Sequence, residues 1–191
     1  MQALTVLSIR DLQSLIERFD PRGDERAYTG KVQTLALLGQ AEAALDRRNY
    51  APGHVTASGI VLSPDGSHVL LVFHRRLGRW LQPGGHIEPD DRGVVEAAAR
   101  EVVEETGVAP RWEVDPLLVG LDVHEIPRSE REPAHLHHDV VWRFVAATDR
   151  LGSNLASERA VWCPVDGLER YGADGPLRRS VARAVGVDSP A

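Results

Sequence analysis

Cysteine is almost absent from this chain, whose 191 residues include only Cys163. A single cysteine excludes a disulfide within the chain and is typical of proteins from a reducing compartment. No run of about 18 apolar residues occurs, so no membrane-spanning helix is expected. Residues 1–20 carry charges within their apolar pattern, unlike a secretory signal. These absences predict a cytoplasmic protein without a membrane partner.

Positive charge is also scarce, since 22 Lys and Arg residues stand against 28 Asp and Glu residues, for a net charge of −6. A general nucleic-acid binder needs a basic patch, so we expect no nucleic-acid partner. An acidic protein can still act on anionic substrates where bound metal ions supply the positive charge. The length fits one domain with a small extension.

Two helical patterns open the chain. Apolar residues recur about every 3.6 residues over 4–19 and again over 32–45, with a break at Pro21–Asp24. We expect residues 1–50 to form an N-terminal helical extension that covers the main domain or dimerises it, so a homodimer is one expectation. The alternative for this extension is a role in substrate selection. Residues 51–191 would form the main domain.

The main domain combines strand patterns with one strong helical pattern over 93–106. Further helical segments are expected at 165–170 and 176–185. Strands on both sides of a central helix predict an α/β fold with a mixed sheet between helices, an α/β/α sandwich. The predicted strands cover residues 54–63, 69–73, 117–124, 137–147 and 160–163.

Three carboxylates, Glu101, Glu104 and Glu105, occupy positions i, i+3 and i+4 of the central helix. This spacing places them on one face, where like charges repel one another by a few tenths of a kcal/mol (about 0.2–0.5) per pair. A cation bound among them would explain why they stand together, and hard ions such as Mg²⁺ prefer carboxylate oxygens. Gly107 is a good helix stop. The opposite, buried face is predicted to consist of Val95, Ala99, Val102 and Thr106.

Pro83-Gly84-Gly85 predicts a bend of the backbone. The segment Gly84-Gly85, followed by R-E-V-V-E-E-T-G-V from Arg100 to Val108, resembles the signature of the Nudix hydrolase family. That signature reads Gly, five residues, Glu, seven residues, then Arg-Glu-apolar-x-Glu-Glu-x-Gly-apolar. The second half matches completely, whereas the first half carries a one-residue insertion before the helix. Its acidic position falls on Asp91, so Asp91 or Glu88 is expected to steady Arg100. The segments G-H-V-T-A-S, R-W-L-Q-P-G-G-H and E-P-A-H-L-H-H-D also resemble a bacterial subgroup.

The resemblance implies hydrolysis of a nucleoside diphosphate linked to another group, with Mg²⁺ or Mn²⁺ as cofactor and a small nucleotide-like molecule as partner. Glu101, Glu104 and Glu105 would bind the metal together with the carbonyl group of Gly84. The general base would be one of these glutamates or Glu158 from a later loop. A base within reach of the attacking water is required for this reaction.

Two alternatives use the same fold. One is a non-catalytic nucleotide-binding or regulatory module. The other is isomerisation of isopentenyl diphosphate, which would require a cysteine near the signature. Cys163 lies far from the signature in the sequence, so isomerisation is the less favoured alternative.

Five of the eight histidines, His86, His124, His135, His137 and His138, lie where an active cleft is expected. Because residues two apart share a face of a strand, His135, His137 and Asp139 are expected to point one way. His138 falls on the apolar side and is expected to be a core histidine.

Asp122 and His124 share a face on the preceding strand, and a hairpin would bring them close to the first polar set. His86 follows the Gly84-Gly85 segment directly. Together, His86, His124 and the set of His135, His137 and Asp139 could contact the substrate, hold a second metal such as Zn²⁺, Mn²⁺ or Fe, or form a structural network.

Overall fold

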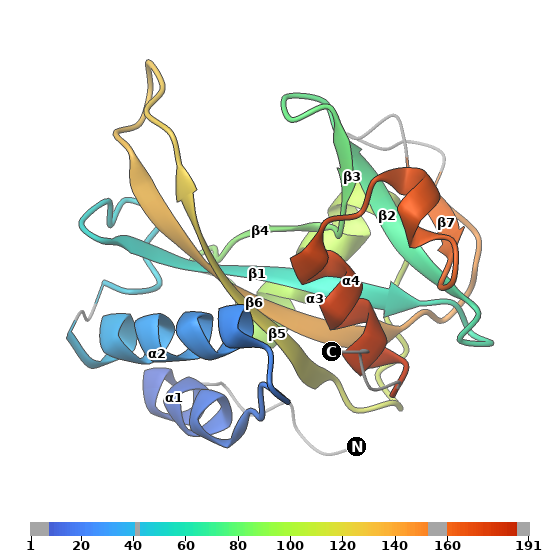
Figure 1. Cartoon of the computed structure of the whole chain (residues 1–191), viewed down its shortest axis with the longest axis horizontal. Coiled ribbons are helices and arrows are strands. Elements are labelled where there is room, and N and C mark those ends of the chain that lie inside the picture. Colours follow the sequence, from blue (N-terminus) through green and yellow to red (C-terminus); the bar gives the residue numbers. More distant parts are fainter. Residues whose placement is uncertain (1–7, 41–42, 153–159, 187–191) are drawn as a thin grey trace.

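A computed structural model describes residues 8–40, 43–152 and 160–186, and its centre is a seven-stranded mixed sheet (Figure 1). Its main path runs in the order β3-β2-β1-β6-β5, with β4 paired to β1 and β7 paired to β2. Within the described ranges, no helix has both the length and the apolar character needed to cross a membrane. The strands are β1 (Gly53–Leu62), β2 (His68–His74), β3 (Arg79–Leu81), β4 (Gly84–His86), β5 (Leu117–Ile126), β6 (His135–Val145) and β7 (Ala160–Pro164).

Helices cover both faces of the sheet, which confirms the predicted α/β/α sandwich (Figure 1). The first three helices pack with one face and α4 packs with the other. The predicted helix at 165–170 is only a short 3-10 helix, η1. The helices are α1 (Ile9–Arg18), α2 (Glu25–Gln40), α3 (Val94–Thr106), η1 (Leu168–Tyr171) and α4 (Gly175–Ala184).

Strand β1 lies at the centre of the molecule and is buried along its whole length. It runs parallel to β6 through ten consecutive residue pairs. Its odd-numbered residues, such as Val55 and Val61, join the core beneath α1–α3, while Ile60 joins the core beneath α4. The first half of the α4-facing side is polar instead of apolar, with His54, Thr56 and Ser58 at alternate positions. This polar half marks the place where a site can form.

The N-terminal helices share the core of the sheet. Leu12 and Ile16 are fully buried and belong to the same apolar cluster as Val55 and Val140 of the sheet. The second helix begins at Glu25, earlier than the apolar run at 32–45 predicted. The side chain of Asp24 caps it by accepting hydrogen bonds from the first backbone N–H groups of the helix. Residues 8–40 therefore cover the sheet, as one of the two predicted roles requires.

Asp24 joins α2 to α4. Its carboxylate accepts hydrogen bonds from the backbone N–H of Ala27 (3.2 Å), from Arg179 Nε (2.7 Å) and from Arg183 Nη2 (2.8 Å). Burial by itself would raise the pKa of Asp24. The hydrogen bonds from Arg183 and Ala27, with the charges of both arginines, outweigh that effect and lower it. The carboxylate therefore stabilises the folded protein in its charged form.

Replacing Asp24 by asparagine is expected to lower the free energy of unfolding at neutral pH by about 1–3 kcal/mol. Asparagine also caps helices, so the change removes mainly the charge. Since the folded-state pKa lies below the unfolded value of about 3.9, the contribution is present above that pH. It is lost as the pH falls through the folded-state pKa. Urea unfolding at several pH values should show wild type and variant converging in acid.

Asp46→Asn is the matched control, because Asp46 is paired only locally with the exposed Arg48. Equal stability of wild type and Asp24→Asn at neutral pH would contradict the assigned role of the Asp24 carboxylate.

Candidate active site

Helix α3 presents one buried face and one polar face. Val102 and Thr106 are fully buried, and Val95 and Ala99 are nearly so, which confirms the predicted core face. Gly107 adopts a left-handed conformation (φ 69°) and its N–H bonds to the carbonyl of Val103, so it ends the helix as predicted. The glutamates lie away from this core: the carboxylates of Glu101 and Glu105 reach β4, whereas Glu104 is exposed.

Gly84 and Gly85 form part of a strand, β4, and not the bend that the sequence predicted. The strand is paired antiparallel with β1, with Gly84 opposite Ser58, and a Cβ at Gly84 would collide with that serine. The backbone N–H of Gly84 donates to Glu105 Oε2 at 3.1 Å. A Cβ at Gly85 would stand 2.6 Å from the carboxylate of Glu101. Both glycines therefore let the carboxylates of α3 approach the backbone closely.

Arg100 organises the carboxylates around it. Its Nε and Nη2 donate to the two oxygens of Asp91 at 2.9 Å each, a bidentate arrangement that fixes the guanidinium plane. Its Nη1 donates to Glu101 (2.9 Å) and Glu104 (3.2 Å), and Nη2 also reaches the carbonyl of His86 (2.9 Å).

Glu88, the second acid predicted to support Arg100, faces Arg47 at 3.7 Å instead. The loop geometry explains why Arg100 pairs with Asp91 and not with Glu88. The backbone N–H of Glu88 donates to Asp91 Oδ2 at 2.8 Å and so turns the Asp91 side chain inward. The side chain of Asp91 is only 5% exposed, which favours its pairing with a guanidinium.

Burial makes the carboxylates of α3 favourable ligands for a cation. It raises the pKa of Glu101 despite the hydrogen bond from Arg100, and it raises the pKa of Glu105 to about 7 despite the hydrogen bond from Gly84. A divalent cation would stabilise the charged forms of both groups. Carboxylate oxygens beside a glycine backbone suit Mg²⁺ or Mn²⁺, so the residues present fit the cofactor that the sequence predicted.

Replacing Gly85 by alanine is expected to lower metal-dependent turnover by about 100-fold, since a displacement of about 1 Å in a catalytic group can cost that much. The added Cβ displaces the Glu101 carboxylate, which is the flexible end of a side chain, so the fold should survive. Activity assays and thermal unfolding measure the two effects separately. In the control Gly39→Ala, the new Cβ has no described atom within 4 Å. Equal losses in the two variants would contradict this explanation.

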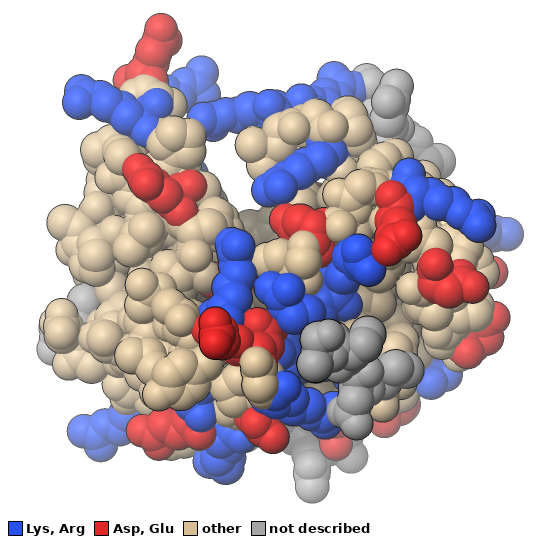
Figure 2. All heavy atoms as spheres, viewed as in Figure 1, with Lys and Arg blue, Asp and Glu red and all other residues tan. Residues whose placement is uncertain are grey.

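A cleft of about 280 Å³ opens on the α4 side of the sheet. Its walls are β3 and the following Gln82, residues 120–126 of β5, the start of α2 and one side of α4. In Figure 2 arginine and acidic side chains gather around the middle of this face, between α2 and α4. The predicted residues Asp122, His124 and Asp139 line this cleft.

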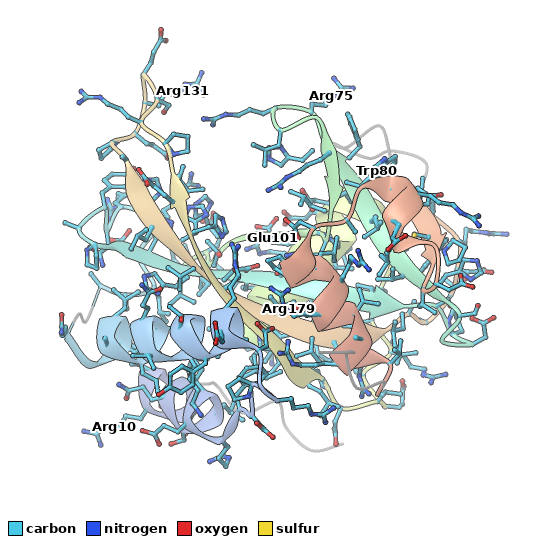
Figure 3. All side chains as sticks on the ribbon, in the orientation of Figure 1. Arg10, Arg75, Trp80, Glu101, Arg131 and Arg179 are labelled. Atoms are coloured by element: carbon cyan, nitrogen blue, oxygen red, sulfur yellow. The ribbon has the colours of Figure 1, made fainter. Side chains whose placement is uncertain are left out.

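Arginines from three separate elements also line the cleft, and the sequence analysis did not find them. They are Arg26 of α2, Arg79 of β3, and Arg179 and Arg183 of α4; Arg179 is labelled in Figure 3 together with Glu101. Arg26 Nε donates to Asp122 at 2.6 Å. No local pattern could have indicated these residues, because only the packing of α2 and α4 around the edge strand β5 brings them together.

Asp139 connects the cleft with the glycine strand. It is buried, which raises its pKa, and it accepts hydrogen bonds from Ser58 Oγ (2.7 Å), Thr56 Oγ1 (3.2 Å) and Gln82 Nε2 (3.3 Å). Ser58 is the partner of Gly84 in the sheet. The cleft and the carboxylates of α3 are therefore joined through β1 and β4.

The histidines separate into three groups. β5 and β6 form the predicted hairpin, with His124 opposite His137. His138 lies on the other face and bonds to Thr34 of α2 at 3.2 Å, as expected of a core histidine. His86, His135 and His137 cluster beside the cleft, where the ring of His124 lies 5.7 Å from that of His137. Glu158, the other predicted general base, lies outside the described residues.

A sequence profile described as the NUDIX domain matches residues 52–184, more than half of the chain. The chain belongs to the Nudix family. No curated protein matches it. The family signature coincides with the carboxylates of α3 and the Gly84-Gly85 strand described above.

Solved structures share the fold of this Nudix protein at low sequence identity. A MutT protein from Bacillus halodurans is 20% identical, with a TM-score of 0.54, over 70% of this chain and 83% of its own. The dihydroneopterin triphosphate pyrophosphohydrolase of E. coli is 16% identical, with a TM-score of 0.54, over 69% and 94%. A MutT protein from Methanosarcina mazei Go1 is 20% identical, with a TM-score of 0.51, over 68% and 91%.

Proposed function

We propose that this Nudix protein is a divalent-metal-dependent hydrolase that cleaves a pyrophosphate bond in a nucleoside diphosphate linked to another moiety. The proposal rests on one observation: the carboxylates of Glu101 and Glu105 lie against the Gly84-Gly85 strand. Arg100 holds Glu101 in place by a hydrogen bond. Such a set of oxygens, beside an arginine-lined cleft, suits a substrate with phosphate groups.

Each residue has a distinct part in the proposed reaction. Glu101, Glu104 and Glu105, with the carbonyl of Gly84, would hold the metal. When bound, Mg²⁺ or Mn²⁺ neutralises phosphate oxygens and lowers the pKa of the attacking water. Arg100 orients Glu101 and Glu104 through its Nη1 donors.

The proton of the attacking water passes to a carboxylate, either a glutamate of α3 or Glu158. The substrate lies with its non-reacting part in the cleft, where the free N–H donors of a guanidinium such as that of Arg79 contact phosphate or ribose oxygens. Asp139 keeps Ser58 and Gln82 in place between the two regions.

The isomerase alternative requires a reactive cysteine at the site. Cys163 is instead fully buried in the apolar core between β7 and α4, and burial raises its pKa above the usual thiol value. A thiol in such surroundings is a poor nucleophile, which disfavours isomerisation.

The decisive test is a phosphate-release assay on a panel of substrates with Mg²⁺ and with Mn²⁺. The panel should include nucleoside triphosphates, ADP-ribose, nucleotide sugars, dinucleoside polyphosphates and dihydroneopterin triphosphate, the last because of the related fold of an enzyme named for it. We expect metal-dependent turnover of at least one compound. Nucleotide binding without turnover across the panel would contradict hydrolysis and favour the non-catalytic module.

A further inference from the structure

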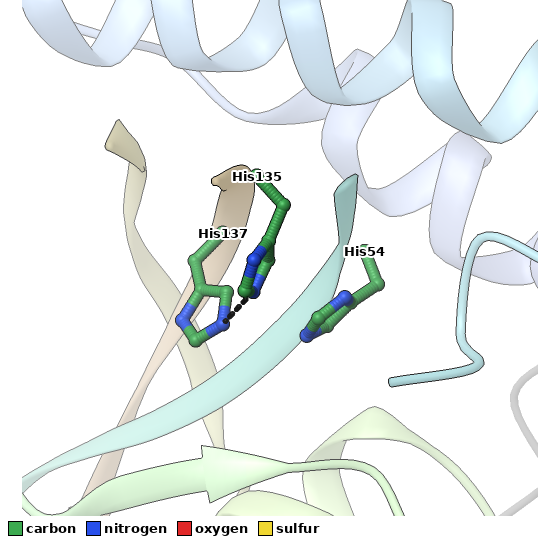
Figure 4. A group of neighbouring side chains, drawn as sticks. All are labelled: His54, His135 and His137. Carbon is green, nitrogen blue, oxygen red and sulfur yellow. Dashed lines mark hydrogen bonds between the residues drawn. The ribbon is translucent and has the colours of Figure 1, made fainter. Parts of the chain in front are cut away.

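Three histidines meet where β1 and β6 run side by side. His54 lies opposite His137 in the parallel register, and His135 lies two residues earlier on the same strand. Each offers one ring nitrogen, and these three atoms all lie within 4.8 Å of one another (Figure 4). The cluster shares no residue with the carboxylates of α3 or with the cleft lining, but it adjoins the cleft, because the ring of His124 lies 5.7 Å from that of His137.

Hydrogen bonds to the backbone fix the orientation of two of the rings. His54 Nδ1 lies 3.1 Å from the carbonyl oxygen of Asn49, and His135 Nδ1 lies 2.8 Å from that of Pro133. A carbonyl oxygen can only accept, so each Nδ1 carries the proton and each Nε2 presents a lone pair. Histidines that bind metals are usually held in this way.

His54 Nε2 gives independent evidence of a missing ligand. The residue is 1% exposed, and this nitrogen has no hydrogen-bond partner within the described residues. An unsatisfied buried lone pair costs free energy, about 1–3 kcal/mol in proteins. The ring of His54 packs against those of His135 and His137, whose centroids lie 5.1 Å and 4.8 Å away.

The distances suit a metal ion. His135 Nε2 and His137 Nε2 are 3.2 Å apart and share a hydrogen bond, which His137 donates and which a bound ion would replace (Figure 4). A tetrahedral Zn²⁺ with Zn–N bonds of about 2.0–2.1 Å sets its nitrogen ligands about 3.3 Å apart. Since the three ligand atoms lie within 4.8 Å of one another, His54 would have to approach the pair by at most about 1.5 Å.

The surroundings keep the imidazoles neutral, as metal binding requires. Burial lowers the pKa of His54, and burial with the neighbouring His54 and His86 lowers the pKa of His137 to about 3. The ring of His86 stands beside the three, 5.1 Å from His54 and 5.2 Å from His137. It is a candidate for the fourth ligand.

We propose that His54, His135 and His137 bind a transition-metal ion of the Zn²⁺ type, at a second metal site distinct from the carboxylate site. Imidazole ligands select zinc and its neighbours, whereas carboxylates suit Mg²⁺ and Mn²⁺, so the two sites take different ions. The bound ion ties β1 to β6. It stands next to β4, whose His86 carbonyl accepts a hydrogen bond from Arg100.

The test uses the full chain with Glu101, Glu104 and Glu105 changed to glutamine, so that the carboxylate site cannot contribute. After incubation of this Glu101→Gln, Glu104→Gln, Glu105→Gln variant with Zn²⁺ and removal of free ion, elemental analysis is expected to find one zinc per chain. Titration with Co²⁺ should give the intense visible absorption of a tetrahedral nitrogen-ligated ion. Adding His137→Gln should weaken zinc binding by more than about 100-fold, because loss of a group that only hydrogen-bonds to a ligand already costs about 10- to 100-fold.

His74→Gln is the matched control, since His74 is exposed on the β2–β3 hairpin and has no part in the cluster. It should leave zinc stoichiometry and the Co²⁺ spectrum unchanged. The proposal is overturned if the variant with Glu101, Glu104 and Glu105 changed to glutamine binds less than a tenth of a zinc ion per chain. Equal affinity with and without His137 also overturns it. None of these readouts depends on hydrolytic activity, so failure of the proposed function leaves them interpretable.

Discussion

Replacing Glu105 by glutamine is expected to lower kcat/KM for the preferred substrate by about 1,000-fold, or about 4 kcal/mol of transition-state stabilisation. Glutamine keeps the shape of the side chain, and its amide oxygen can still accept the hydrogen bond from Gly84. It removes the negative charge that would hold the metal. The loss should therefore appear in the affinity for Mn²⁺ as well as in turnover.

Glu96→Gln provides the matched control on the same helix. Glu96 pairs with the exposed Arg92 at 2.7 Å and does not reach β4. Exposed pairs of this kind contribute at most about 1 kcal/mol, so turnover should change by less than about twofold. Unchanged turnover in Glu105→Gln, with Mn²⁺ affinity intact, would show that this carboxylate is not a metal ligand.

Replacing Ile16 by alanine is expected to lower the free energy of unfolding of the whole chain by about 2–5 kcal/mol. Ile16 lies on α1, is fully buried and packs in the same core as the sheet. The loss of its side chain leaves a cavity between the N-terminal helices and β1. The helical extension, residues 1–50, is thus proposed to unfold together with the main domain and not as a separate unit.

Two spectroscopic probes distinguish these possibilities. All four tryptophans lie between residues 80 and 162, so fluorescence reports on the main domain, whereas far-ultraviolet circular dichroism also reports on α1 and α2. Both transitions in urea should shift together. A circular dichroism transition that moves while fluorescence stays in place would show two independent units. The control Val32→Ala, at a site 49% exposed on α2, should change stability by no more than about 0.5 kcal/mol.

Local sequence patterns predicted the elements that depend on residues close together in the chain. The register of Glu101, Glu104 and Glu105 and the stop at Gly107 follow from helix geometry, because three or four residues make a turn. Likewise, alternation along β6 placed His137 and His138 on opposite faces. The Nudix family itself was identified from one continuous segment, which the sequence profile confirms.

Patterns of glycine and of short strands were less informative. Gly84-Gly85 indicated a bend, yet the residues form β4. The glycines are used there for close packing, because a side chain at Gly85 would collide with the Glu101 carboxylate of α3. Because of the inserted residue, the sequence could not decide whether Asp91 or Glu88 pairs with Arg100. The turn of the backbone at Glu88 directs Asp91 inward, and no spacing rule contains that information.

Helix α3 with its glutamates, the sandwich of helices and strands, and the family could all be predicted from the sequence. Each depends on short-range periodicity or on a continuous motif. Only the tertiary structure brought Arg26 and Arg179 to one cleft, chose Asp91 for Arg100, and set His54 against His135 and His137. These groupings join residues that are far apart in the chain. Their distances depend on strand register and on helix packing around β5, which local patterns do not encode.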